Sequence, residues 1–325
     1  MSAEISNQLL ELPLVISAEK CSGGTYIVTG ANTGLGLEAA KHLVAVGAAK
    51  VILGVRNVPA GEAAKNRIIQ DTGITGTAEV WALDLSSYDS VKAFAKKAIA
   101  ELDRIDAVIE NAAVATGQGK AEEHNLCMTV NVYSTILLAL LLLPKLKENA
   151  KRFGTTPHIA IVSSGAAFDL RDKWSEIRDD PLVKADDPDI GLVSYPLSKL
   201  VEIFVVRELA KLLPVSETGV VLNLVNPGLC KTELSRNAPP EFQKQLADMH
   251  AKFGRTAEVG SRTLLHGAVG GNGSHGSYLS DCEVADYKLP SWITDEEGKK
   301  DQELVWNSLA KELEVVSPGS VNVIL

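Results

Sequence analysis

Short runs of apolar, mostly β-branched residues recur along the chain, separated by longer stretches with helical spacing. The apolar runs lie at residues 25–29, 50–53, 79–83, 107–109, 158–162 and 220–225, and a seventh, shorter run lies at 276–279. The helical stretches include residues 35–46, 60–70, 87–102, 122–149 and 195–213. This alternation predicts an α/β fold in which a parallel sheet carries helices on both faces.

The pattern favours one domain over residues 1–325, because no Pro/Gly/Ser-rich linker, composition shift or internal repeat divides the chain. We therefore expect a single-domain, doubly wound, Rossmann-like parallel sheet. Two segments fall outside the alternation. Residues 169–189 are strongly charged and predict an exposed insertion, and residues 233–325 form a tail in which 295–313 predicts a helix.

The first predicted strand leads through a glycine-rich turn directly into a helix, with the spacing Gly-x-x-x-Gly-x-Gly over residues 30–36. Glycines let the backbone turn sharply and approach a pyrophosphate, and a helix N-terminus offers unpaired N–H groups and a favourable dipole. The turn therefore predicts a dinucleotide phosphate site, and a tight connection without a ligand is the alternative. The residues assigned to it are Gly30, Asn32, Thr33, Gly34, Leu35 and Gly36.

The end of the second predicted strand indicates which dinucleotide the site prefers. An acid about 20 residues after the glycines commonly binds the adenosine ribose hydroxyls. Here the strand ends Gly54-Val-Arg-Asn57, without an acid, and Arg56 carries a guanidinium suited to a 2′-phosphate. We therefore expect NADP(H) over NAD(H), while an ordinary surface arginine is the alternative.

Tyr195 and Lys199 are one helical turn apart at the start of a predicted helix, so their side chains share a face. A free tyrosine ionises near pH 10, too high for acid–base work at neutrality, but a neighbouring ammonium stabilises the phenolate. The spacing predicts a tyrosine that donates or accepts a proton with help from the lysine. A packed tyrosine beside a solvent-facing lysine is the alternative.

These residues and several others occur in the order found in one enzyme family. The motifs are Thr29-Gly-x-x-x-Gly-x-Gly36, Asp84-Leu85, Asn111-Ala112, Asn131, Ser163-Ser164, Tyr195-x-x-x-Lys199 and Pro227-Gly228-x-x-x-Thr232. Over residues 23–232 the chain resembles the short-chain dehydrogenase/reductase family. Its retinol-dehydrogenase-like subgroup, which includes fungal biosynthetic reductases, is the most similar, through Val28-Thr-Gly-Ala-Asn-Thr-Gly-Leu-Gly36, Gly54-Val-Arg-Asn57 and Tyr278-Leu-Ser-Asp-Cys282.

The resemblance implies a role for each catalytic position. Tyr195 would be the general acid in reduction or the base in oxidation, and Lys199 would lower its pKa and bind the nicotinamide ribose. Ser164 would hydrogen-bond the substrate carbonyl, with Ser163 as the alternative. Asn131 would hold a water that links Lys199 to solvent.

The resemblance also implies the cofactor contacts. Asp84 and Leu85 would lie at the adenine, and Asn111 and Ala112 near the adenosine ribose and the sheet. The nicotinamide would be framed by Pro227, Gly228 and Thr232. The family's usual Asn-Asn-Ala-Gly is Glu110-Asn-Ala-Ala113 here, which puts the local backbone fit in doubt more than the chemistry.

Charge and composition narrow the partners. The 41 acidic and 32 basic residues give a net charge of −9, and no long basic cluster suggests nucleic-acid binding. The four cysteines and six histidines lack metal-ligand spacing, so we expect no metal and reduced, mostly buried thiols. The longest apolar run, 136–143, is too short for a membrane span, and no signal peptide is apparent, so a cytoplasmic location is expected.

Two apolar patterns each leave an alternative open. Residues 136–143 are expected to be buried in the core, but helices at this position in the family often meet another subunit, which allows a homodimer or homotetramer. The family places a mobile substrate lid after the Pro-Gly motif. Phe242, Leu246, Met249 and Phe253 recur there at helical intervals and either cover an apolar substrate or simply pack an amphipathic helix.

The sequence therefore predicts an NADP(H)-dependent oxidoreductase that interconverts a ketone or aldehyde and its alcohol. The subgroup suggests a bulky apolar substrate, such as a polyketide, terpenoid or retinoid-like compound, by analogy only. NAD-linked alcohol oxidation is one alternative, and a nucleotide-binding regulator without turnover is the other.

Overall fold

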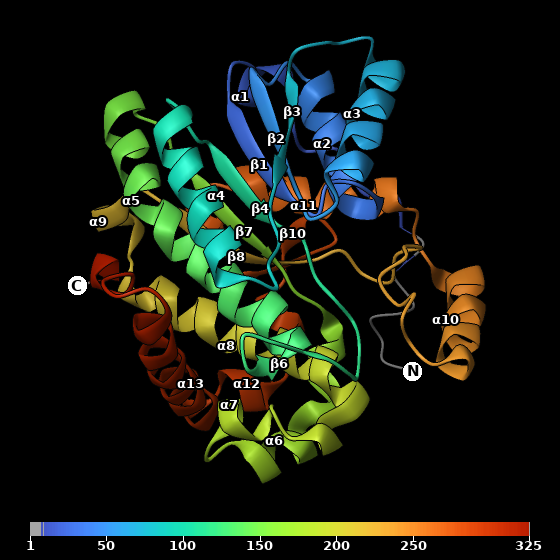
Figure 1. Cartoon of the computed structure of the whole chain (residues 1–325), viewed down its shortest axis with the longest axis vertical. Coiled ribbons are helices and arrows are strands. Elements are labelled where there is room, and N and C mark those ends of the chain that lie inside the picture. Colours follow the sequence, from blue (N-terminus) through green and yellow to red (C-terminus); the bar gives the residue numbers. More distant parts are fainter. Residues whose placement is uncertain (1–7, 9, 325) are drawn as a thin grey trace.

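The computed structural model describes residues 8 and 10–324 and is organised around one eight-stranded sheet (Figure 1). The strand order is β10-β9-β8-β7-β4-β1-β2-β3, and every neighbouring pair is parallel except β9 with β10. The strands are β1 (Thr25–Thr29), β2 (Lys50–Val55), β3 (Ala78–Ala82), β4 (Ala107–Glu110), β7 (His158–Val162), β8 (Val221–Asn226), β9 (Tyr278–Ser280) and β10 (Glu283–Val284). The predicted doubly wound parallel sheet is confirmed.

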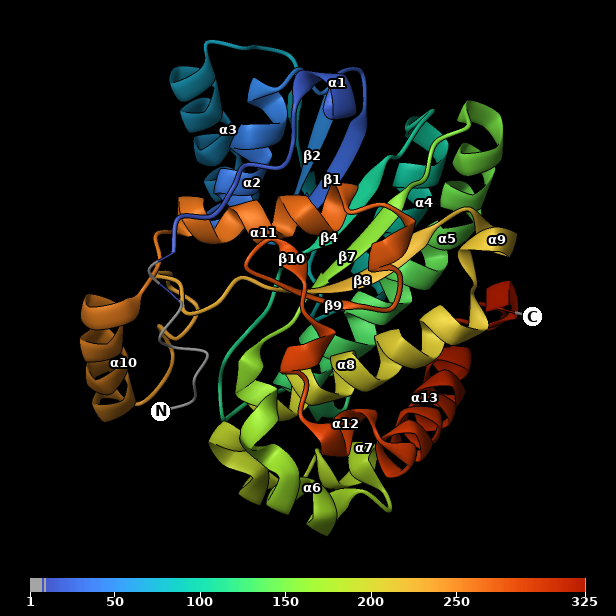
Figure 2. The ribbon, with the colours of Figure 1, turned by 180° about the vertical axis from the view of Figure 1, so that it is seen from behind.

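The helices form layers on the two faces of the sheet, and each layer encloses its own apolar core (Figures 1 and 2). One layer contains α2 (Gly34–Ala45), α3 (Val58–Thr72) and α11 (Ala257–Val269). The other contains α4 (Tyr88–Glu101), α5 (Thr135–Phe153) and α8 (Ser194–Leu212), with α13 (Glu296–Val316) packed outside α8. The tail helix predicted at 295–313 is therefore confirmed as α13.

The chain winds toward β2 and β3 from one side of β1 and toward β4, β7 and β8 from the other. Helices that follow β1 and β4 cover opposite faces, so the chain diverges where these two neighbouring strands end. In open parallel sheets such a switch point leaves a crevice at the carboxyl ends of the strands, where ligands bind. The predicted glycine turn follows β1, which places it at this crevice.

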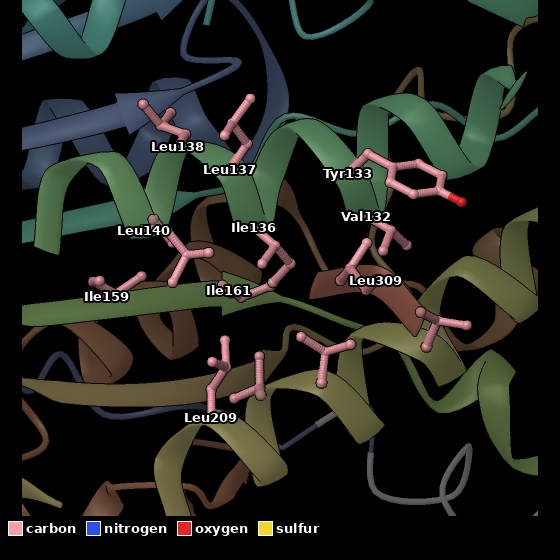
Figure 3. Packing of buried hydrophobic residues seen from close by; sticks show 14 of the residues in the cluster. Val132, Tyr133, Ile136, Leu137, Leu138, Leu140, Ile159, Ile161, Leu209 and Leu309 are labelled. Atoms are coloured by element: carbon pink, nitrogen blue, oxygen red, sulfur yellow. The ribbon is translucent and has the colours of Figure 1, made fainter. Parts of the chain in front are cut away.

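Residues 136–143 lie in α5 and are largely buried in the core, as predicted. Ile136 and Leu140 lie against Ile159 and Ile161 of β7 in Figure 3, and all four are buried. Within the described residues, one helical segment, Met128–Phe153, is long and apolar enough to cross a membrane, but 89% of its apolar window is buried inside the protein. A homodimer or homotetramer stays a prediction.

The prediction that a helix begins at residue 122 is wrong. Residues 120–125 form a hairpin of β5 (Lys120–Ala121) and β6 (His124–Asn125), whose turn residues Glu122 and Glu123 have φ values of 50° and 70°. Such left-handed residues cannot continue a right-handed helix. A π-helix, η2 (Met128–Ser134), then leads directly into α5.

The segment predicted as an exposed charged insertion is instead largely helical and partly buried. It contains η3 (Gly165–Leu170), α6 (Arg171–Ile177), α7 (Pro181–Lys184) and η4 (Pro188–Val193). Trp174 is buried, and its Nε1 donates a 2.6 Å hydrogen bond to the buried Asp301 of α13. Arg178 donates to the same carboxylate at 2.7 Å, so charged residues here tie the segment to α13 instead of facing only water.

Replacing Asp301 should therefore destabilise the fold. Asp301→Ala leaves the Trp174 indole N–H and the Arg178 guanidinium without their acceptor, and should cost about 2–3 kcal/mol of unfolding free energy in urea titrations. Glu297 also pairs with Arg178, but its side chain is 71% exposed, so Glu297→Ala should cost less than about 0.5 kcal/mol. Equal losses for the two variants would contradict this account.

Candidate functional site

The glycine turn between β1 and α2 is folded so that its glycines lie where side chains do not fit. Gly30 has φ +67°, and a Cβ there would lie 2.9 Å from Cα of Ala112. A Cβ on Gly36 would lie 2.6 Å from Nδ2 of Asn111 and 2.8 Å from the Gly30 carbonyl oxygen. The glycines thus let the turn pack on the end of β4 and leave the N-terminus of α2 accessible, which fits a pyrophosphate.

Asn111 closes the junction between β1 and β4 beside this turn. Its Nδ2 donates to the Thr29 carbonyl oxygen at 2.8 Å, and the backbone N–H groups of Asn111 and Ala112 each donate to Thr29 Oγ1 at 2.9 Å. Ala113 stands at the family's glycine position, yet its φ is not positive. Ala113 therefore fits the backbone without strain, because this conformation does not require glycine.

The segment after β8 lies opposite the glycine turn. A Cβ on Gly34 would lie 3.4 Å from the Thr232 methyl carbon, and Gly228 has φ +80° with its N–H donating to Asn226 Oδ1 at 3.0 Å. Gly34 and Thr232 also line a cleft of about 400 Å³ that extends to Lys231 and His250. Thus Thr232 lies on the same crevice as Thr33 and Gly34, while Pro227 and Gly228 directly follow the carboxyl end of β8.

The predicted adenosine contacts lie at the ends of neighbouring strands. Arg56 directly follows β2, is exposed, and pairs with no acid among residues 8 and 10–324. Asp84 and Leu85 follow β3, and Asp84 Oδ1 accepts hydrogen bonds from the Ser86 N–H at 2.9 Å and the Ser86 hydroxyl at 2.6 Å. A free guanidinium at this edge fits a phosphate attached to the adenosine ribose.

Tyr195 and Lys199 lie on the first turns of α8, with the lysine ammonium 5.7 Å from the centroid of the tyrosine ring. Burial raises the pKa of Tyr195, and the Lys199 ammonium opposes that rise. The ammonium is itself buried and donates to the Val162 carbonyl oxygen at 2.8 Å and to Glu202 Oε1 at 2.7 Å. The solvent-facing lysine of the alternative interpretation is thereby excluded.

The two serines after β7 point in different directions. Ser163 is buried, and its hydroxyl donates to the Lys199 carbonyl oxygen at 3.2 Å, so it braces α8. Ser164 is only partly buried, and its hydroxyl lies near enough to Tyr195 to lower the pKa of that tyrosine. Of the two serines, Ser164 is therefore the one whose hydroxyl can hydrogen-bond the same ligand atom as Tyr195.

Asn131 is fully buried in the π-helix before α5, and both ends of its amide are used. Oδ1 accepts from the Val114 N–H at 2.9 Å, while Nδ2 donates to the Val114 carbonyl oxygen at 3.0 Å and to Ser198 Oγ at 2.9 Å. Ser198 in turn donates to the Tyr195 carbonyl oxygen at 2.7 Å. Asn131 therefore connects the chain leaving β4 to the helix that carries Tyr195.

Sequence reasoning missed three residues of this site: Glu110, Ser198 and Glu202. Glu110 ends β4 and Glu202 lies in α8, and both are buried. The signal was available, because each acid is embedded in an apolar run, Ala107-Val-Ile-Glu110 and Leu200-Val-Glu-Ile-Phe204. Acids in such runs are seldom buried without a partner or a role.

The remaining candidates show no further chemistry. Cys21, Cys127 and Cys230 are buried, Cys282 is partly buried, and all four are free thiols. Within the described part of the chain, no three histidine, cysteine or acidic side chains gather as a metal site would require. The chemistry of the crevice is thus that of a dinucleotide turn beside a tyrosine and a buried lysine.

Comparisons with known proteins agree with this arrangement. The family model for short chain dehydrogenase matches residues 25–176. The short chain dehydrogenase/reductase dmxR8 of Cryptosporiopsis sp. is 42% identical over 92% of this chain and 93% of its own length. The short-chain dehydrogenase anuD of Penicillium roqueforti is 35% identical, covering 91% and 79% respectively.

Solved structures share the fold at lower identity. L-sorbose reductase from Gluconobacter frateurii, solved with NADPH and L-sorbose, has a TM-score of 0.60 and 19% identity, covering 80% of this chain and 95% of that one. The chain belongs to the short-chain dehydrogenase/reductase family and groups with fungal members of it. It is therefore an oxidoreductase, and the family binds a nicotinamide cofactor.

The packing of Gly36 against β4 gives a direct test of the glycine turn. Gly36→Ala forces a methyl group against Asn111 and the Gly30 carbonyl, and should cost about 1–3 kcal/mol of stability and weaken nicotinamide-cofactor binding in fluorescence titrations. Gly273 is exposed, has an ordinary φ and nothing within 4 Å of its Cβ position, so Gly273→Ala is the matched control. Unchanged cofactor binding by Gly36→Ala would contradict the assignment.

Proposed function

We propose that this protein is an NADP(H)-dependent carbonyl reductase, or the corresponding alcohol dehydrogenase, acting on a bulky apolar ketone or aldehyde. The observation that carries the proposal is the group formed by Tyr195, Ser164 and the buried Lys199 beside the glycine turn. A buried ammonium is costly to desolvate, and binding a ribose hydroxyl would not by itself require it to lie beside a tyrosine ring. Its place beside a tyrosine supports proton transfer.

The nicotinamide cofactor, when bound, supplies or accepts the hydride. Residues 30–36 would hold its pyrophosphate, Asp84, Leu85, Asn111 and Ala112 its adenosine, and Pro227, Gly228 and Thr232 its nicotinamide end. Tyr195 donates its hydroxyl proton to the substrate oxygen during reduction, and Ser164 hydrogen-bonds the same oxygen. Lys199 stabilises the phenolate that remains, because its ammonium lies beside the ring. In oxidation the Tyr195 phenolate accepts the hydroxyl proton of the alcohol.

Asn131 positions the helix that carries Tyr195 and Lys199. Its hydrogen bonds to Val114 and Ser198 fix the start of α8, and thus the position of Tyr195, relative to the sheet. Positioning within a fraction of an ångström is a large part of catalysis, so this buried amide should matter without touching substrate. The water that the family resemblance places between Asn131 and Lys199 belongs to the same proposal.

The exposed apolar side chains of helix α10 (Pro240–Phe253) support the proposal of an apolar substrate. The helix follows the Thr232 segment and extends away from the sheet and its helices in Figures 1 and 2. No residue within it is buried, and the apolar Phe242 and Met249 are 43% and 37% exposed. Simple amphipathic packing would have covered these side chains, whereas a lid that closes over an apolar substrate has a use for them.

The cofactor preference rests on Arg56. Arg56→Ala should weaken NADPH binding by roughly tenfold or more and leave NADH binding nearly unchanged, because a charge-assisted contact to phosphate contributes about 1.5–3 kcal/mol. Arg152→Ala, at the exposed end of α5, serves as the control for a lost surface arginine. Equal affinity of the unmodified protein for both cofactors would rule out the NADP(H) assignment and favour NAD-linked oxidation.

The reaction itself is tested at Tyr195. Tyr195→Phe keeps the ring but removes the proton donor, so turnover of a ketone or aldehyde should fall by roughly 100- to 10,000-fold while NADPH still binds. The assay follows NADPH absorbance with a panel of carbonyl compounds, and Tyr287→Phe, an exposed tyrosine, is the control. Nearly normal turnover by Tyr195→Phe would show that the proton comes from another group.

A further inference from the structure

A buried acid lies at the end of β4, on the face of the sheet that α8 covers, and the mechanism above does not use it. Glu110 is the last residue of β4, in register with the apolar Ile161 of β7. It shares a face of the sheet with Val108, on the side covered by α4, α5 and α8. Its carboxyl group is buried, and neither oxygen has a hydrogen-bond partner. A buried carboxylate without a partner is strongly disfavoured.

The second acid, Glu202, comes from α8. Its Oε1 accepts the hydrogen bond from Lys199, while its Oε2 is buried and unpartnered like the oxygens of Glu110. The side chains of Lys199 and Glu202 are only 3% and 2% exposed. Glu110 lies close enough for the charge of Glu202 to act on it, so one buried cation accompanies two buried carboxyl groups. One ion pair can neutralise only one of the carboxyl groups.

The ionised carboxylate of Glu202 helps to fix the position of the Lys199 ammonium. An ammonium has three protons, and two of them are donated to the Val162 carbonyl oxygen and to Glu202. These two anchors, one on β7 and one on α8, leave the third proton for the side of Tyr195 and the cofactor. Glu202 therefore determines where the positive charge lies relative to the reacting ring.

We propose that Glu110 and Glu202 form a buried acid pair that retains one proton, with ionised Glu202 as the positioning residue for Lys199 and neutral Glu110 completing the charge balance. The inference rests on the proposed function of Tyr195 and Lys199. Net charge in the pocket is then zero before catalysis. Because Glu202 is negative, the pair also offsets part of the effect of Lys199 on Tyr195.

The electrostatics of the pocket support this arrangement. Burial, and then the charge of Glu202, raises the pKa of Glu110 well above its ordinary value of 4.5. Burial raises the pKa of Glu202 to about 7, although Lys199 opposes the rise. Among residues 8 and 10–324, the other titratable groups that act on Lys199 or Glu202 are Tyr195 of α8 and Cys127 before the π-helix. Burial raises the pKa of the Tyr195 hydroxyl and of the Cys127 thiol, so both are neutral at pH 7.

The pH dependence of stability tests the retained proton without any assay of activity. In the unfolded chain Glu110 ionises above its ordinary pKa, so unfolding at pH 7–8.5 releases the proton that the folded pair retains. Stability from this group is then lost as the pH rises, and the unfolding equilibrium constant increases about tenfold per pH unit from this one proton. Glu110→Gln should remove that factor in urea titrations of the cofactor-free protein.

Glu208→Gln is the matched control, because Glu208 is also buried on α8 but pairs with the exposed Lys211. It should keep the pH dependence of the unmodified protein, and the same dependence in Glu110→Gln would overturn the proposal. If Glu110→Gln does not fold, Glu110→Met should show the same loss. The unmodified protein should also show the infrared carbonyl band of a neutral carboxylic acid at pH 8, and its absence would overturn the proposal independently.

The effect on the lysine is tested by the double variant Glu110→Gln/Glu202→Gln, which allows no carboxylate beside Lys199. The pKa of Tyr195 should then fall, because the negative charge that raises it is removed. Since Tyr195 must be protonated to reduce a carbonyl, the alkaline limit of kcat should move down by roughly one pH unit. A uniform loss of kcat with an unmoved pH profile would assign the pair a structural role only.

Discussion

The junction of β1 and β4 is the constraint on which the rest of the structure depends. Two adjacent parallel strands that lead to opposite faces of a sheet must separate at their carboxyl ends, and the separated ends expose backbone groups. Thr29 and Asn111 satisfy those groups with three hydrogen bonds across the junction. Gly30 and Gly36 then pack directly on this bridge, so the glycine turn and the end of β4 form one unit.

The start of α8, which carries Tyr195 and Lys199, is attached to the sheet by buried hydrogen bonds. Lys199 donates to the end of β7, and Asn131 joins the chain after β4 to Ser198 at the start of α8. Both contacts are buried, so they persist without competition from water. Tyr195 is therefore held by the sheet and by its own helix, which explains how a partly exposed side chain keeps a defined position.

The sequence predicted the sheet well, because buried parallel strands give continuous apolar runs and the family motifs lie at their ends. It could not predict the hairpin at residues 120–125, where Glu122 and Glu123 adopt left-handed conformations that their types do not favour. It also missed the helices of 165–193, because Trp174 is buried by a contact with Asp301, 127 residues further along the chain. The hydrogen bonds by which Asn131 joins Val114 to Ser198 also arise only from tertiary contacts. The same holds for the effect of the Glu202 charge on Glu110.

The attachment of residues 165–193 to α13 has a consequence for exchanging substrate preference between relatives. This segment connects Ser164 to Tyr195, the two residues proposed to contact the substrate oxygen. Trp174 and Arg178 within it are nevertheless held by Asp301, an acid of α13. A chimaera that imports the segment alone would leave Asp301 buried without its donors. The two stretches form one structural unit, and an exchange of specificity that preserves folding has to transplant both together.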